Sequence, residues 1–310
     1  MNLIKKFLVI SVVGCMLLFV GCSSNNTSSE ERNEIHVTTT IAQIADVVKN
    51  VGGEKVKVES LMGPGIDPHA YNASQGDISK LSNADIIFYN GLNLEGKMGE
   101  IFKNMEKDKP TIAVAETIPA HLLLEDEEEA GMPDPHVWFD INLWIHVVEA
   151  IKEELIKLDN DNKEFYEKNA DSYIAEITDL HEWAIEEIKS IPEESRVLIT
   201  AHDAFQYFGS AYSIEVMGLQ GLSTDAEYGL HDVRELIEVI TTRNIKAVFV
   251  ESSISDESIR SVVEGAKSRG HEVVIGGELY SDAMGDAGTE EGTYIGMFKH
   301  NIRTIVDALK

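Results

Sequence analysis

The sequence predicts an α/β protein of two lobes with mostly parallel sheets, joined by one long rigid helix. Three observations predict this fold class. Apolar runs of strand length alternate with helical patterns in the first half of the chain, and the same alternation returns in the last third. Between them, residues 143–191 contain no glycine, no proline and no strand-like run. Apolar residues at helical spacing within this stretch predict helices.

The amino terminus has the pattern of a secretory signal peptide. Two lysines precede an apolar run over residues 7–20, which is shorter than the roughly 20 residues that span a bilayer. The Gly21-Cys22 pair at its end resembles a bacterial lipobox, in which the cysteine is lipidated and begins the mature protein. We expect a signal peptide over residues 1–21 and a lipid anchor at Cys22. An ordinary secretory cleavage near this cysteine is the alternative.

Composition limits what the folded part can do. Residues 22–34 are polar and predict a flexible tether. The chain has 26 Lys and Arg against 54 Asp and Glu, a net charge of −28, which argues against a nucleic-acid partner because nucleic acid requires a basic surface. Cys15 and Cys22 both precede the folded part, so it contains no disulfide and no thiolate ligand. Any metal site there must use nitrogen and oxygen donors.

The first lobe is expected over residues 35–160 and the linking helix over residues 161–189. Asp159-Asn-Asp-Asn interrupts the helical pattern and marks the start of this helix, which would span roughly 40 Å. Strand patterns in the first lobe cover residues 35–40, 55–62, 84–89 and 111–114, and a helical pattern covers residues 74–81.

The second lobe is expected over residues 190–310, where strands and helices alternate again. Its strand patterns cover residues 196–200, 214–217, 247–250 and 272–275. Its helical patterns cover residues 204–212, 231–243, 256–269 and 294–309. This alternation predicts a second parallel sheet with helices on its faces.

Four potential metal ligands share one kind of setting. His69 and His136 each end an Asp-Pro-His tripeptide, and His202 and Asp282 each follow a predicted strand. Ligands of parallel sheets bind beyond the carboxyl ends of the strands, so we expect these side chains to meet in the cleft between the lobes. Three imidazoles and one carboxylate complete the first shell of a divalent transition metal. The sequence therefore predicts a site for one metal ion.

Neighbouring residues are candidates for a supporting role. Asp67, Asp134 and Asp203 lie beside the histidines and are candidate acceptors for the remote ring N–H groups. His231 stands in a polar loop before a helix and is a further candidate to line the cleft. Glu251 ends a predicted strand, and we expect a structural cap there rather than a role at the site.

Four longer motifs carry a family resemblance. They are Gly65-Ile-Asp-Pro-His-Ala-Tyr, Asp134-Pro-His-Val-Trp-Phe-Asp, Thr200-Ala-His-Asp-Ala-Phe-Gln-Tyr-Phe and Gly276-Gly-Glu-Leu-Tyr-Ser-Asp-Ala-Met-Gly. With them the chain resembles the manganese/zinc solute-binding lipoproteins of bacterial ABC importers. The resemblance implies two α/β lobes bridged by a long helix, and a metal in the cleft held by His69, His136, His202 and Asp282. It also implies a lipid-anchored monomer on the outer face of the cytoplasmic membrane, which delivers its ion to a permease with an ATPase subunit.

The resemblance leaves the identity of the metal open. Many zinc-dedicated members carry a His-rich loop where residues 121–132 of this chain have one histidine, which favours manganese. Many manganese-dedicated members have glutamate at the position of His202, which favours zinc. We expect Mn2+ or Zn2+ as cargo, with manganese slightly favoured. The alternatives are a surface adhesin with a structural metal and a secreted zinc hydrolase; the chain has no His-Glu-x-x-His motif, and we expect no enzyme.

Overall fold

The computed structural model describes residues 34–125, 131–225 and 228–310 of the chain. The predicted signal peptide (1–21), Cys22 and all of the tether except Glu34 lie outside these residues. The stretch Glu34–Lys310 forms one compact unit. Among the described helices, none is long and apolar enough to cross a membrane.

The first half of this unit contains a sheet of four parallel strands in the order β2-β1-β3-β4. Its strands are β1 (Ile35–Thr39), β2 (Val56–Ser60), β3 (Ile86–Tyr89) and β4 (Thr111–Ala113). The helices that connect them are α2 (Ala42–Gly52), α3 (Gln75–Asn83) and α4 (Gly99–Met105). Ser74 and Asp77 form a capping box that fixes the start of α3. All four strands that the sequence predicts in this half are confirmed.

The second half repeats the alternation of strands and helices. Strand β5 pairs in parallel with β6, β7 pairs in parallel with β8, and β5 lies beside β7. These strands are β5 (Val197–His202), β6 (Glu215–Gln220), β7 (Ala247–Glu251) and β8 (Val274–Leu279). The helices are α7 (Gln206–Tyr212), α8 (Leu230–Arg243), α9 (Glu257–Ser268) and α10 (Tyr294–Leu309). The predicted α/β class with parallel sheets is confirmed.

Strands β6 and β8 extend beyond their predicted ends because each continues through glycine. A Cβ atom on Gly218 of β6 would lie 2.6 Å from the backbone nitrogen of Asp203. A Cβ atom on Gly276 of β8 would lie 2.6 Å from the Cβ of Ala308 on α10. Glycine here allows close packing against the strand, although the same residue type indicates a break when only the sequence is considered.

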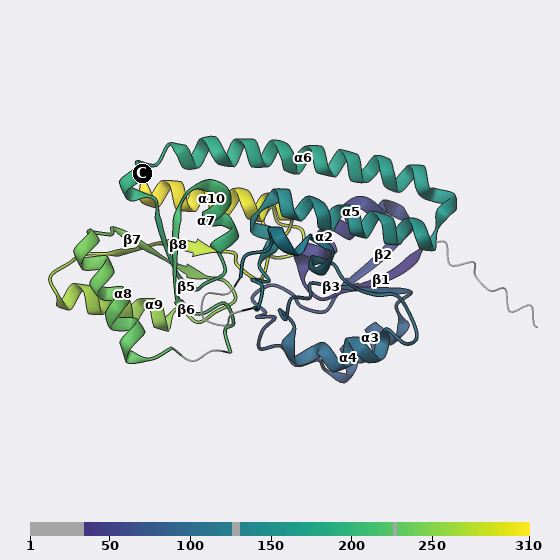
Figure 1. Cartoon of the computed structure of the whole chain (residues 1–310), viewed down its shortest axis with the longest axis horizontal. Helices are drawn as coiled ribbons and strands as arrows, with labels where there is room; N and C mark the ends of the chain where they lie inside the picture. Colours follow the sequence, from purple (N-terminus) through teal and green to yellow (C-terminus); the bar gives the residue numbers. More distant parts are fainter. Residues whose placement is uncertain (1–33, 126–130, 226–227) are drawn as a thin grey trace, which may run out of the picture. The chain divides into compact units, whose positions relative to one another are not determined.

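Two long helices lie next to each other along the unit, and Figure 1 shows α6 crossing above elements of both halves. They are α5 (Ile141–Leu158) and α6 (Lys163–Lys189), and a short 3-10 turn at Asn160–Asn162 separates them. At 27 residues, α6 is about 40 Å long. It packs against α2 and α5 of the first half and against α7 and α10 of the second. The long helix predicted over residues 161–189 is confirmed, with its start at Lys163.

The main apolar core is continuous between the two halves. One cluster of buried side chains includes Val37 and Phe88 from the first sheet together with Phe205, Phe249 and Phe298 from the second half. A smaller cluster lies between β5, β7, α8 and α9. Because the large core crosses from one half to the other, it resists rotation of one half against the other.

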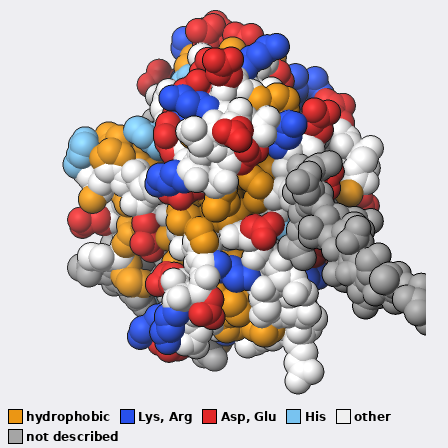
Figure 2. Space-filling model, turned by 90° about the vertical axis from the view of Figure 1, so that its right-hand side faces the viewer, with side chains coloured by type: hydrophobic (Ala, Val, Ile, Leu, Met, Phe, Trp, Pro, Cys, Tyr) orange, Lys and Arg blue, Asp and Glu red, His pale blue; other side chains and the backbone are white. Residues whose placement is uncertain are grey.

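Charged side chains are interspersed on the surface. In the face shown in Figure 2, acidic and basic side chains alternate around a band of apolar side chains. Pairs such as Lys103 with Glu100 and Lys163 with Glu167 stand one helical turn apart at 3.5 Å. Pairs of this kind contribute only a few tenths of a kcal/mol each, about 0.2–0.5. Their main effect is therefore on solubility.

The contact between α6 and α2 gives a first testable prediction. Asp46 on α2 is buried, and burial raises its pKa although Tyr173 on α6 donates a hydrogen bond to it at 2.9 Å. Replacing Tyr173 by Phe leaves this carboxyl with one donor fewer, and we expect the free energy of unfolding to fall by about 1–3 kcal/mol. Urea unfolding measures the change. Tyr228→Phe, at a 41% exposed position, is the matched control, and equal midpoints for the two variants would contradict the prediction.

Candidate metal centre

The structure brings the four predicted ligands together. His69 lies in the loop after β2, and His136 immediately precedes the short 3-10 helix Val137–Phe139 that leads into α5. His202 is the last residue of β5, and Asp282 lies three residues beyond β8. Each residue offers one donor atom, and these atoms all lie within 4.8 Å of one another. All four side chains are buried, with at most 4% of any residue exposed.

The distances between donors match the shell of a small metal ion. The Nε2 atoms of His69 and His136 are 3.3 Å apart. Asp282 Oδ1 lies 3.5 Å from His136 Nε2, and its Oδ2 lies 3.4 Å from His202 Nε2 and 3.8 Å from His69 Nε2. A tetrahedral ion with bonds of about 2.0–2.1 Å separates its donors by about 3.4 Å. The four atoms therefore stand where one ion can contact all of them.

Unpartnered polar atoms at the centre also indicate a cation. Among the described residues, both carboxylate oxygens of Asp282 and the Nε2 of His202 are buried without a hydrogen-bond partner. Buried polar atoms are nearly always paired, because an unpaired one loses its hydration without compensation. A metal ion between these atoms would supply the missing partner, so the residues present fit one bound ion.

In two of the three ligand histidines, a carboxylate lies close to Nδ1, the ring nitrogen that is not offered to the metal site. Asp134 Oδ1 accepts the backbone N–H of His136 at 2.9 Å and lies 2.7 Å from its ring Nδ1. Glu251 Oε1 accepts the backbone N–H of His202 at 2.9 Å, and Oε2 lies 2.6 Å from Nδ1. A proton held on Nδ1 leaves Nε2 free for a metal. Asp134 thus fixes both the ring and the backbone of His136, whereas Glu251 fixes the backbone of His202 and lies at ion-pair distance from its ring.

The other predicted supporting residues lie elsewhere. Asp67 accepts the backbone N–H of His69 at 2.9 Å and the hydroxyl of Thr224 at 2.6 Å, so it fixes the loop and ties it to the second half. The carboxylate of Asp203 accepts the side-chain amide of Gln206. His231 lies on α8 with its side chain 87% exposed, near Glu235. Of the four residues predicted to support the histidines, only Asp134 contacts the ring of a ligand histidine, at the nitrogen that faces away from the other ligands.

The loops that carry the ligands are tied to the opposite half of the unit. The Gln43 amide on α2 donates to the backbone oxygen of Asp282 at 3.1 Å. Trp138 Nε1 donates to the backbone oxygen of Ser281 at 3.1 Å. In the reverse direction, the Tyr207 hydroxyl on α7 donates to the backbone oxygen of Asp134 at 3.0 Å. These three bonds, here called the cross-ties, fix the loops that carry the ligands against the other half of the unit.

Burial and charge set different protonation states at the centre. Burial lowers the pKa of His69 to about 3, against the field of Asp282. Burial also acts to lower the pKa of His202, but Glu251 and Asp282 outweigh it and raise this pKa well above the usual 6.5. For Asp282, burial acts to raise the pKa, yet the histidines, His202 foremost, hold it below its usual range. A metal that binds His202 therefore displaces a proton.

Fold and site together define the class: an α/β protein with three imidazoles and one carboxylate buried at one point, able to hold a single divalent metal ion. Residues 37–308 match the family described as zinc-uptake complex component A, periplasmic, and the chain belongs to that family. It is 51% identical over 306 residues to the manganese-binding lipoprotein MntA of Bacillus subtilis (strain 168), covering 99% of this chain and 100% of that protein.

Two further comparisons cover a wider range of similarity. The chain is 32% identical over 309 residues to the metal ABC transporter substrate-binding lipoprotein SsaB of Streptococcus sanguinis, with 98% of each chain covered. Among solved structures, it is similar to the periplasmic zinc-binding protein TroA from Treponema pallidum, with a TM-score of 0.87 and 48% sequence identity. That match covers 89% of this chain and 99% of the other. The architecture of two α/β halves and one long helix is thus a property shared with relatives.

Proposed function

We propose that this protein is the extracytoplasmic metal-binding component of an ABC importer, which captures one Mn2+ or Zn2+ ion as cargo and delivers it to a membrane permease. The convergence of His69, His136, His202 and Asp282 is the observation that carries this proposal. Their buried donors have the spacing of a metal shell, and no other protein group is needed to complete it. The names of the similar proteins, a manganese-binding lipoprotein and a metal transporter component, support the same function.

The donor set favours a carrier over a catalyst. Catalytic zinc usually keeps three protein ligands and an open position for water, whereas here four protein side chains each offer a donor. We therefore infer that the protein has no enzymatic activity. The three imidazoles suit zinc and the carboxylate suits manganese, and the similarity to a manganese-binding lipoprotein favours manganese as the physiological cargo.

The partners follow from the role of a carrier. We infer that a monomer, anchored by a lipid on Cys22 to the outer face of the bacterial cytoplasmic membrane, hands its ion to a permease that is driven by an ATPase subunit. The amino-terminal motif and the relatives' description as lipoproteins support the anchor. Mass spectrometry of the protein purified from its membrane would test it through the mass of a lipid on the first residue.

Calorimetric titration of the metal-stripped protein tests the proposed function. We expect one equivalent of either ion to bind, with zinc tighter than manganese because manganese stands at the weak end of the first-row divalent order, which peaks at copper, and zinc binds nitrogen donors more strongly. At about 1,000 times the dissociation constant, the ion should stabilise the fold by roughly 4 kcal/mol. The chelator-stripped protein should retain its circular dichroism spectrum. Unfolding on metal removal would instead indicate a structural ion, as in an adhesin, and absence of binding would overturn the proposal.

A further inference from the structure

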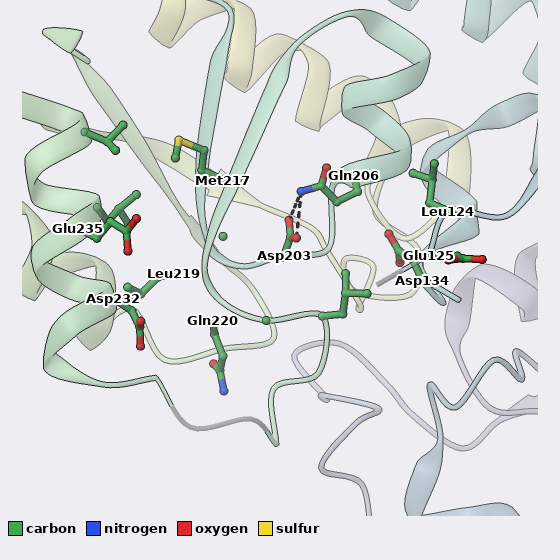
Figure 3. Close-up of a pocket in the computed structure, with 15 residues that line it drawn as sticks. Leu124, Glu125, Asp134, Asp203, Gln206, Met217, Leu219, Gln220, Asp232 and Glu235 are labelled. Carbon is green, nitrogen blue, oxygen red and sulfur yellow. Dashed lines mark hydrogen bonds between the residues drawn. The ribbon is translucent and has the colours of Figure 1, made fainter. Parts of the chain in front are cut away.

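A cavity of about 370 Å³ lies beside the metal centre. Figure 3 shows its walls, which come from β6 and α8 and from the segment at Leu124 and Glu125. None of the four metal ligands lines this cavity, so it is a separate space. Its volume lies within the range of small-molecule sites, roughly 300–1,000 Å³.

The cavity has carboxylates at two opposite ends and apolar side chains in its walls; a fifth carboxylate, Asp203, lies between the ends (Figure 3), and the Gln206 amide donates to its oxygens. Asp232 and Glu235 come from α8, whereas Glu125 and Asp134 come from the segment before α5, and Figure 3 places the two pairs on opposite sides. The apolar side chains in the wall include Met217, Leu219, Leu236 and Val239. This arrangement suits a ligand with an apolar middle and a positive charge at each end.

Asp134 supplies an independent observation, a buried carboxylate oxygen that has no donor in the described part of the chain. The residue is 1% exposed, and its Oδ1 is occupied by the backbone and ring of His136. Its other oxygen, Oδ2, has no hydrogen-bond partner among the described residues. A buried carboxylate oxygen without a donor is costly, so a cationic donor that enters the cavity would find a preformed acceptor.

The carboxylates of the cavity are too dispersed to chelate a metal ion. Within the described ranges, the metal centre is the one group of three or more His, Cys, Asp or Glu side chains placed so that they could hold a metal ion. A chelated divalent ion needs several oxygens at 2.3–2.6 Å or closer. Separate points of negative charge joined by apolar wall match an elongated organic cation better than a metal.

We infer that this cavity binds a linear aliphatic diamine. One ammonium group lies toward Asp134 and Glu125, the other lies toward Asp232 and Glu235, and the alkyl chain contacts the apolar wall that includes Met217. Charge-assisted hydrogen bonds hold the two ends, and burial of the methylene groups adds to the affinity. The net charge of −28 favours the approach of any dication.

Methionine-methyl NMR tests the inference on the metal-loaded protein, with 1,4-diaminobutane as the probe. We expect a saturable shift of the Met217 methyl resonance, identified by its loss in Met217→Leu, while the resonance of Met297 in the core stays unchanged. Butylamine, with one charge, should bind at least about tenfold more weakly, and neutral 1,4-butanediol should not shift the resonance. The variant Asp282→Ala should bind the diamine normally, which separates this site from the metal centre.

Matched variants on α8 complete the test. Glu235→Gln should weaken diamine binding about tenfold, whereas Glu238→Gln, an exposed position on the same helix outside the cavity, should leave it unchanged. Three results would overturn the inference: no Met217 shift at roughly 10 mM diamine, a level that reveals even weak binding; an equal shift with magnesium chloride at the same ionic strength; or equal affinities in the two glutamine variants.

Discussion

Replacing Asp282 by Ala is expected to weaken metal binding about a thousandfold, equivalent to roughly 4 kcal/mol. Asp282 is the one anionic ligand of the set, and its two oxygens lie 3.4–3.8 Å from all three ligand nitrogens. Without it, the ion would meet three neutral imidazoles in a buried site and lose its charge compensation. Competition with a chromophoric chelator measures the affinity of the variant and of the parent protein.

The same variant should remain folded, because neither side-chain oxygen of Asp282 accepts a hydrogen bond from the described residues. Asp286→Ala is the matched control, since Asp286 is an exposed carboxylate only four residues further along. Asp282→Asn keeps the shape of the side chain and removes only its charge, so it should also bind weakly. Affinities within threefold of the parent in both variants of Asp282 would show that another group supplies the anionic ligand.

Replacing Glu251 by Gln is expected to weaken metal binding about 10–100-fold, although Glu251 does not reach the ion. Its Oε1 accepts the backbone N–H of His202 at 2.9 Å, and its Oε2 lies 2.6 Å from the ring Nδ1, within ion-pair distance. A glutamine amide has one oxygen, so its NH2 group must face either the backbone N–H or the ring Nδ1 of His202. In the first case the backbone of His202 loses its acceptor; in the second the proton is no longer held on Nδ1.

Glu257→Gln provides the control for this second prediction. Glu257 is exposed on α9, six residues after Glu251, and carries the same change of charge away from the site. The far-ultraviolet circular dichroism of both variants should match the parent protein. If Glu251→Gln bound metal as tightly as Glu257→Gln, the carboxylate would be a cap at the end of β7 and nothing more.

The ligands themselves could be predicted from the sequence for a definite reason. Parallel strands end at one edge of a sheet, so His202 at the end of β5 and Asp282 just beyond β8, which lie 80 positions apart in the sequence, are brought to the same place by topology. The Asp-Pro-His tripeptides mark His69 and His136 in a similar way, because proline restricts the backbone on both sides. The residue types then define the chemistry of the site.

The supporting contacts could not be predicted, because they join residues far apart in sequence. Glu251 reaches His202 across 49 positions, and Gln43 reaches the Asp282 backbone across 239. Adjacency in sequence identified Asp134 but also suggested Asp203, which binds Gln206 and lines the neighbouring cavity. Such contacts depend on which strands lie side by side, here β5 and β7, and on which way each side chain points.

The cross-ties have a consequence for the time that the ion spends in the protein. An ion leaves quickly when its ligands can separate one after another, but here Gln43, Trp138 and Tyr207 hold the backbones of the ligand loops from the other half. We expect spontaneous escape to be slow compared with diffusion, because separating the ligand loops would break these bonds as well as the metal's own. Unloading at a useful rate then depends on a partner that pulls the loops apart, which makes release a step timed by the transporter.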